Sequence, residues 1–293
     1  MIYPQKTTVY PQVYHSYQQL ILLVDHMQLI LGFLFGALIA LLAWRSNALS
    51  TSGALAAALS GGIVFGLGGF AWAAILLTFF ISSSILSRIC SNRKASINEK
   101  FAKGHQRDWG QVLANGSLGT LLVIITILYP EQNRPWVAYV GAMAAVNADT
   151  WATELGILNP GKPRLITSGK SVEKGSSGGI SLYGYLAAFG GAALIGFVAV
   201  LIQYDQSPLK MLIIIIIGGL VGSTADSILG ATIQAIYSCP NCSKETERYP
   251  LHTCGTETMH YRGWRWLNND WVNFICSLAG GASTLVLYNL LLN

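Results

Sequence analysis

The chain has 293 residues, of which 52% are hydrophobic and only 11% are charged, and its mean hydropathy is +0.47. A typical soluble domain carries about 25% charged residues, so the composition excludes an ordinary water-soluble protein of this length. The apolar residues are grouped in long runs between short polar stretches, which indicates an all-α membrane protein. The net charge of +5 reflects the loops of such a protein and does not indicate a nucleic-acid partner.

Residues 1–26 are rich in Tyr and Gln and lack the basic start and cleavage pattern of a secretory signal. We interpret them as an N-terminal tail or an interfacial segment. Over residues 27–293 the apolar runs predict a polytopic bundle of about eight transmembrane helices, since each run is near the ~20 residues that cross the hydrocarbon core. The predicted spans are 27–44, 50–67, 69–87, 110–129, 135–157, 180–203, 209–236 and 269–291.

Basic residues are unevenly divided between the two sides of this bundle. The loops after the first, third, fifth and seventh spans hold 15 of the 18 Lys and Arg residues, and the other side holds only Lys6, Arg134 and Lys210. By the positive-inside rule, the basic loops are expected to be cytoplasmic and both termini to lie on the opposite side.

Four carboxylates fall inside or at the ends of predicted spans, where a charged side chain is costly and is therefore a functional hypothesis by default. On the fifth span, Asn147, Thr150 and Glu154 are spaced to share one helical face, while Asp149 points to a different face. A segment that is polar on two faces must lie inside the bundle or line a wet cavity. The candidate catalytic residues are Asp149, Glu154, Asp226 and Asp270.

Amide side chains accompany these carboxylates in the corresponding halves of their spans. Interhelical hydrogen bonding is the structural alternative for such groups. In the functional interpretation they would orient a substrate or a metal. The amides predicted to do so are Asn115, Asn147, Asn269 and Asn273.

Clustered carboxylates beside basic loops suit Mg²⁺ and phosphates. Mg²⁺ is commonly held by one or two carboxylates together with substrate phosphates, and phosphoryl transfer needs a cation to neutralise the developing charge. We therefore predict Asp149, Asp226 and Asp270 as Mg²⁺ ligands.

The loop over residues 164–181 is rich in Gly and Ser and leads into a predicted helix N-terminus, a favourable place for anions. Its basic residues Arg164, Lys170 and Lys174 are predicted to bind phosphates. The Gly-Lys-Ser triplet at 169–171 is not a P-loop, because Arg164 stands where the first glycine would be and no strand precedes it. The alternative is a flexible basic loop without a ligand.

The last basic loop, residues 237–266, contains three cysteines and a histidine in a C-x₂-C pattern followed by His and Cys. This pattern fits a structural Cys₃His zinc site that would hold the loop as a hairpin. A redox pair and unligated thiols are the alternatives, and a cytoplasmic location argues against a disulfide. The predicted zinc ligands are Cys239, Cys242, His252 and Cys254.

At these residues the sequence resembles the phytyl-phosphate kinases of tocopherol and phylloquinone synthesis and their uncharacterised relatives. The resemblance covers about residues 50 to 291. It is carried by Gln111–Gly116, Asn147–Gly156, Lys162–Ser181, Ala225–Ser227, Cys239–Cys254 and Asn269–Asn273.

The resemblance implies a membrane-embedded, kinase-like domain that transfers a phosphate from a nucleoside triphosphate, CTP, to an isoprenyl (phytyl) monophosphate and gives the diphosphate. Mg²⁺ and a structural Zn²⁺ are the expected cofactors. The bilayer, a lipid-like isoprenyl phosphate and the nucleotide are the expected partners. Two other classes remain open: an ion-coupled transporter, which would also place carboxylates inside the membrane, and a non-catalytic membrane scaffold built on the zinc hairpin.

Overall fold

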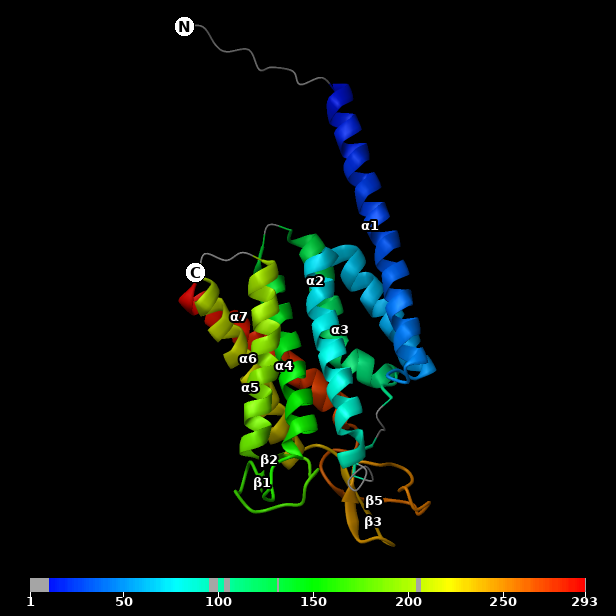
Figure 1. Cartoon of the computed structure of the whole chain (residues 1–293), viewed down its shortest axis with the longest axis vertical. Helices are drawn as coiled ribbons and strands as arrows, with labels where there is room; N and C mark the ends of the chain where they lie inside the picture. The colour runs from blue at the N-terminus through cyan, green and yellow to red at the C-terminus, as the bar shows by residue number, and fades with distance from the viewer. Residues whose placement is uncertain (1–10, 95–99, 103–105, 131, 204–206, 293) are drawn as a thin grey trace.

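The computed structural model describes residues 11–94, 100–102, 106–130, 132–203 and 207–292; Lys6, counted above, lies outside them. Six helices in this part are long and apolar enough to cross a bilayer, which confirms the predicted all-α membrane fold (Figure 1). The helices are α1 (Pro11–Arg45), α2 (Thr51–Lys94), α3 (Trp109–Leu128), α4 (Arg134–Gly156), α5 (Leu182–Ile202), α6 (Pro208–Thr232) and α7 (Asn269–Leu291). The short strands are β1 (Arg164–Leu165), β2 (Gly179–Ile180), β3 (Ile236–Cys239), β4 (Lys244–Thr246) and β5 (Met259–Arg262).

Helix α1 already begins at Pro11, so helical structure extends into the segment interpreted as a tail, while its apolar part begins at His26 as expected. It packs closely on the first part of α2. A Cβ at Gly36 would lie 2.7 Å from the backbone nitrogen of Gly62, which leaves room only for hydrogen at this contact. Small residues of this kind let two membrane helices approach.

Helix α2 consists of two arms that meet at Gly69, whose φ of 72° and ψ of −162° are accessible essentially only to glycine. In the second arm, the carbonyl of Trp72 accepts from the hydroxyl of Tyr139 near the start of α4, and Ser87 donates to Glu154 near its end. The second arm therefore runs alongside α4 in the same direction, and the chain reverses at Gly69. This reversal separates the second and third predicted spans.

Helix α4, the fifth predicted span, is the centre of the bundle. It contacts α2, α3, α5, α6 and α7, and every residue from Pro135 to Ala148 is buried. It is not among the six apolar helices, because it carries polar residues such as Asn147 and Asp149. Its neighbours shield it from lipid, so a less apolar sequence is tolerated there.

Small residues bring α4 and α6 into backbone contact. A Cβ on Gly222 of α6 would lie 2.4 Å from the Cβ of Ala145 of α4 and 2.7 Å from the carbonyl oxygen of Cys276 of α7. Asp149 and Asp226 each follow one turn after this contact on their own helices. The tight packing therefore delivers the two carboxylates to the same region.

The loops that hold the strands lie together at the end of the bundle opposite the start of α1 (Figure 1). β1 and β2 pair in an antiparallel manner in the loop between α4 and α5, and β4, β3 and β5 form a three-stranded antiparallel sheet between α6 and α7. The predicted seventh span, 209–236, is too long, since α6 ends at Thr232 and β3 begins at Ile236. The basic loop between α4 and α5 and the basic loop between α6 and α7 thus lie at the same end of the molecule.

Candidate functional site

A polar cavity of about 330 Å³ lies at this loop-bearing end, between the ends of α4, α6 and α7 and the loop that precedes α5. We refer to it as the acidic cavity. Residues from helices and from loops far apart in the sequence form its wall. The predicted site residues that line it are Asn115, Asp149, Glu154, Lys174, Asp226, Asn269, Asp270 and Asn273.

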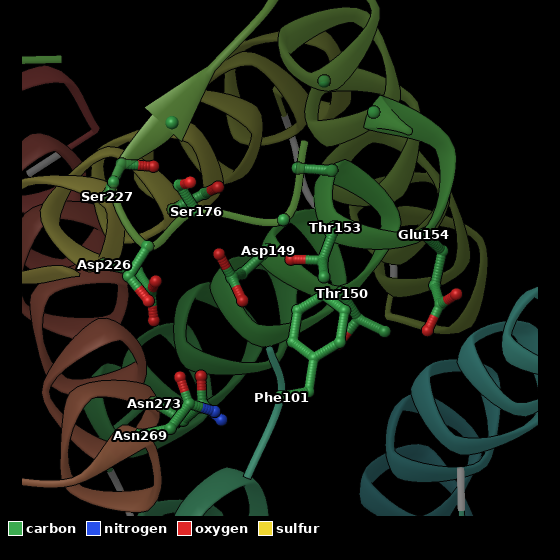
Figure 2. A pocket seen from close by; sticks show the side chains of 18 of the residues that line it. Phe101, Asp149, Thr150, Thr153, Glu154, Ser176, Asp226, Ser227, Asn269 and Asn273 are labelled. Atoms are coloured by element: carbon green, nitrogen blue, oxygen red, sulfur yellow. The ribbon is translucent and has the colours of Figure 1, made fainter. Parts of the chain in front are cut away.

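Asp149 of α4 and Asp226 of α6 point into the same space (Figure 2). They are close enough for their charges to repel one another. The Oδ2 atom of Asp226 is buried and has no hydrogen-bond partner among the residues that the structure describes. Because a buried, unpaired carboxylate oxygen is costly, this atom is suited to a bound cation.

The start of α7 supplies the neighbouring wall. Asn268 caps the helix by accepting from the backbone N–H of Trp271, and Asp270 lies in the first turn, where the helix dipole favours a negative charge. Asn269 and Asn273 are one turn apart and lie beside Asp226 (Figure 2). Oxygen ligands of the kinds that Mg²⁺ accepts thus converge from three helices.

Glu154 lines the cavity but lies away from Asp149, toward α2 (Figure 2). Ser87 of α2 donates to its Oε1 at 2.7 Å. The nearby guanidinium of Arg107 is buried, which lowers the pKa of Arg107 to about 10, and the charge of Glu154 partly opposes this shift. Glu154 therefore belongs to a separate, charge-balanced part of the wall, apart from the aspartate pair.

Asn147 lies outside the acidic cavity and is fully buried. Its Oδ1 accepts from Ser82 at 3.0 Å and Ser83 at 3.1 Å, and its Nδ2 donates to the carbonyl of Gly191 at 2.8 Å. These contacts are the interhelical hydrogen bonds given as the alternative for amides. They also confirm the prediction that Asn147 and Glu154 share one face of the helix, since both side chains accept hydrogen bonds from serines of α2.

Of the three basic residues predicted to bind phosphate, only Lys174 lines the cavity. Its Nζ donates to the carbonyls of Ile157 at 2.9 Å and Asn159 at 2.5 Å, so it also satisfies the C-terminal end of α4. Arg164 and Lys170 are exposed outside the cavity. A β-hairpin loop carries them away from the aspartate pair, which spacing along the sequence does not reveal.

The backbone from 175 to 181 forms a further part of the cavity wall, with Ser176 beside the aspartates (Figure 2). Gly178 has a φ of 79°, and a Cβ there would lie 2.5 Å from the Cβ and from the backbone nitrogen of Ala231 at the end of α6. Only glycine fits this approach. Three glycines and three serines of this segment line the cavity, so its wall contains backbone N–H groups and hydroxyls of the kind that bind an anion.

Glu247, which the sequence did not single out, joins these walls. It accepts from Ser177 at 2.7 Å, from Gln234 at 2.9 Å and from the backbone N–H of Ala102 at 3.5 Å. Burial raises the pKa of the Glu247 carboxyl, and the hydrogen bond from Ser177 opposes this shift. The residue lies in the cysteine-rich loop, where its sequence neighbours indicate only a zinc hairpin, so no local signal marks it.

The four predicted zinc ligands come together at the sheet. One ligand atom from each of Cys239, Cys242, His252 and Cys254 lies within 4.8 Å of the others. Nδ1 of His252 is 3.3 Å from Sγ of Cys254, and the sulfurs of Cys239 and Cys254 are 3.5 Å apart. Tetrahedral zinc with Zn–S bonds of about 2.3 Å requires ligand atoms at about this spacing.

The charges in this cluster also favour a cation. Hydrogen bonding with Thr256 and His252 lowers the pKa of Cys254 to about 5, whereas hydrogen bonding with Cys254 and then burial raise the pKa of Cys242 to about 11. Three adjacent sulfurs cannot all ionise without a positive partner. The donor set and its geometry therefore fit a structural zinc that would close the turn between β3 and β4.

This architecture defines a polytopic membrane protein with an internal acidic site at one end of its bundle. Residues 34–281 match the family described as Integral membrane protein DUF92. The chain belongs to this family of integral membrane proteins, which agrees with the resemblance at the level of the family.

The chain is similar to several proteins, three of which illustrate the range. It is 33% identical to Protein PGR of Arabidopsis thaliana over 273 residues, covering 86% of this chain and 93% of the relative. It is 31% identical to the uncharacterized membrane protein MJ0933 of Methanocaldococcus jannaschii, with 89% and 95% covered, and 26% identical to the uncharacterized membrane protein sll0875 of Synechocystis, with 74% and 76% covered. No solved structure gives a significant match.

Proposed function

We propose that this protein is a membrane-embedded kinase that transfers a phosphate from a nucleoside triphosphate, with CTP as the preferred donor, to an isoprenyl monophosphate such as phytyl phosphate. The observation that carries the proposal is the convergence of Asp149 and Asp226 on one polar cavity that the glycine- and serine-rich backbone of 175–181 also lines, with Ser176 beside them (Figure 2). Carboxylates and anion-binding donors are the two components that phosphoryl transfer needs.

Asp149 and Asp226 would hold Mg²⁺, together with Asp270 on α7, and the ion would neutralise the negative charge of the phosphates. The buried, unpartnered Oδ2 of Asp226 supports this assignment. Asn269 and Asn273 would orient the phosphates or their bound water beside the carboxylates. The hydroxyl of Ser176 and backbone N–H groups of the 175–181 segment would donate to phosphate oxygens.

In the reaction an oxygen of the acceptor phosphate bonds to the γ-phosphorus while the bond between that phosphorus and its bridging oxygen breaks. The products are the isoprenyl diphosphate and a nucleoside diphosphate. The attacking phosphate is already ionised, so no strong general base is required. Catalysis is then mainly a matter of positioning and of charge neutralisation, which matches a site without a histidine near the aspartates among the described lining residues.

The position of the cavity favours a kinase over an ion-coupled carrier. Loop residues such as Ser177, Glu247 and Asn268 line it, so it lies at one end of the bundle. A carrier is expected to bind its substrate near the bilayer midplane, between related halves. In our proposal this end is cytoplasmic, as the positive-inside rule implies, so a soluble nucleotide reaches the cavity while the acceptor stays in the membrane.

The test uses purified protein in detergent or nanodiscs with Mg²⁺, each of four nucleoside triphosphates and a panel of prenyl monophosphates. We expect diphosphate formation, and a loss of at least about a hundredfold for Asp149→Asn and Asp226→Asn, as expected when charge stabilisation in the transition state is removed. Glu173→Gln is the matched control, because this carboxylate is exposed, pairs with Lys100 and lies outside the cavity. Absence of turnover with every donor and acceptor would overturn the proposal.

A further inference from the structure

A second cavity, of about 430 Å³, lies beside the acidic cavity and is lined by residues of α1, both arms of α2 and the start of α3. We refer to it as the apolar chamber. Aromatic and aliphatic side chains such as Phe35, Phe65 and Leu76 form most of its wall. Its volume is in the range of about 300–1,000 Å³ that is usual for small-molecule sites. The transfer reaction as described above gives this chamber no role.

Three polar residues, Arg107, Gln111 and Asn115, line both cavities. They lie at the end of the loop before α3 and in its first two turns. One side of this junction is a hydrocarbon-like interior, and the other is the cavity with the aspartates. The combination suits a ligand with a polar head and a long apolar tail.

Arg107 is the charged group of the junction. Its guanidinium lies over the rings of Phe79 and Phe80, at 5.4 and 5.7 Å from their centroids. Its Nη1 atom is buried and has no hydrogen-bond partner among the described residues. A buried donor of this kind is costly unless an acceptor arrives, and the arginine fork matches the oxygens of a phosphate.

The backbone of Arg107 is fixed, so the side chain has a defined origin. Its N–H donates to the carbonyl of Ala48 at 3.0 Å, and its carbonyl accepts from Ser50 at 3.0 Å. The charged group that faces it is Glu154 of α4, whose Oε1 accepts from Ser87 of α2. The guanidinium is thus held at the boundary between the two cavities by the α1–α2 turn.

We infer that Arg107 binds the phosphate of the isoprenyl monophosphate and that the apolar chamber binds its tail. This inference rests on the proposed function for the identity of the acceptor. With the head at Arg107, an acceptor oxygen faces the acidic cavity, where the nucleotide would lie, and the tail never has to enter water. The chamber then selects acceptors by the length of their hydrocarbon chain.

Gly61 of α2 allows this to be tested with a matched pair of variants. It lines the chamber, and a Cβ there would meet only the Cα of Gly36, at 3.9 Å. Gly61→Ala therefore changes the helix while filling little space, and Gly61→Leu also fills the chamber. We measure equilibrium binding of a C20 and a C5 prenyl monophosphate to the full-length protein in detergent, without nucleotide, so that the result does not depend on turnover.

We expect Gly61→Leu to weaken binding of the C20 phosphate at least tenfold relative to Gly61→Ala, and to leave binding of the C5 phosphate within about twofold. Arg107→Gln should weaken the C20 phosphate at least tenfold and leave the C20 alcohol unchanged, and Arg107→Lys should be intermediate because it keeps the charge without the fork. If Arg107→Gln does not fold, the Gly61 pair decides the question.

Three results would overturn the inference: equal C20 binding by both Gly61 variants, equal loss of the alcohol and the phosphate in Arg107→Gln, or displacement of the C20 phosphate by ordinary phospholipid at equal concentration. The last result would identify the chamber as a lipid site. The proposed function can fail separately. If the binding pattern appears but no nucleotide supports turnover, the chamber stands as a prenyl-phosphate site and the kinase assignment is wrong.

Discussion

Gly178 gives the sharpest test of how the 175–181 wall of the acidic cavity is positioned. Its φ of 79° lies in the left-handed region, and an added Cβ would be 2.5 Å from the Cβ of Ala231. Gly169, in the same loop, has a φ of 66°, but a Cβ there would meet nothing within 4 Å. Substitution by alanine therefore causes backbone strain at both positions and steric overlap only at Gly178.

The magnitudes follow from this difference. Left-handed backbone costs a residue with a Cβ about 1–2 kcal/mol, so Gly169→Ala should lower the free energy of unfolding by about that amount. Overpacking adds about 1–3 kcal/mol, so Gly178→Ala should lower it by about 2–5 kcal/mol in total. To relieve the overlap the loop must move off α6, which breaks the hydrogen bond from Ser177 to Glu247 and displaces one wall of the acidic cavity.

The assay is chemical unfolding of the purified protein in detergent, together with diphosphate formation at saturating acceptor. Gly178→Ala should lose at least about tenfold in turnover, since displacement by about an ångström weakens positioned donors, and Gly169→Ala should keep most of it. Equal destabilisation and equal activity of the two variants would refute the reasoning, because it would mean that contact with Ala231 does not position the loop.

Three further predictions concern other parts of the molecule. Because the pKa of Glu247 is raised in the folded protein, the free energy of unfolding in buffer without divalent cations should fall as the pH rises from 4.5, the ordinary pKa of a glutamate, through the raised pKa. Glu247→Gln keeps a hydrogen-bond acceptor and should flatten this pH dependence in unfolding titrations. An unchanged pH dependence would contradict the prediction. Cys239→Ser should lose bound zinc by elemental analysis, whereas Cys90→Ser should retain it; equal zinc contents would speak against the cluster. Gly69→Ala should destabilise by about 1–3 kcal/mol through backbone strain. Gly116→Ala is the control, since a Cβ there meets nothing within 4 Å, and it should be neutral or stabilising. If both variants lose the same free energy of unfolding, backbone strain at Gly69 is not the cause.

Much of the fold is predictable from the sequence because lipid imposes a simple requirement. Each crossing needs a run of apolar residues, so the predicted spans agree with the helices to within a few residues, apart from the start of α1 and the ends of α2 and α6. The break at Gly69 was expected between two adjacent spans, although nothing in the pattern specifies its backbone angles. The sheet was expected only as a hairpin, because strands of two to four residues carry too little periodicity to be recognised.

The candidate site is predictable where helix periodicity decides it. Asp149 and Asp226 converge because each lies one turn beyond a small-residue contact, and the spacing of Asn147 and Glu154 correctly predicts a shared face. Tertiary placement of loops is not encoded in this way. Arg164 and Lys170 lie in the basic loop, yet a β-hairpin turns them away from the cavity.

Two residues that line the acidic cavity, Glu247 and Arg107, were missed for the same reason. Glu247 reaches the cavity because β4 and β3 carry it back over the end of α6, and Arg107 because its backbone pairs with the turn between α1 and α2. Both depend on contacts between segments far apart in the chain. Each appeared in the sequence only as one charge among others in a loop.

The combination of a glycine reversal and a shielded central helix has a consequence for experiments that map membrane sidedness. A hydropathy scan counts Thr51–Ser91 as one crossing and omits Arg134–Gly156. The two errors cancel in parity, so the termini are still assigned to a common compartment. The segments between α2 and α4 are nevertheless assigned to the wrong side of the membrane. Arg107 would be placed in the compartment opposite Glu247, although both residues line one cavity. Reporter fusions or thiol labels designed from such a scan would therefore be misinterpreted.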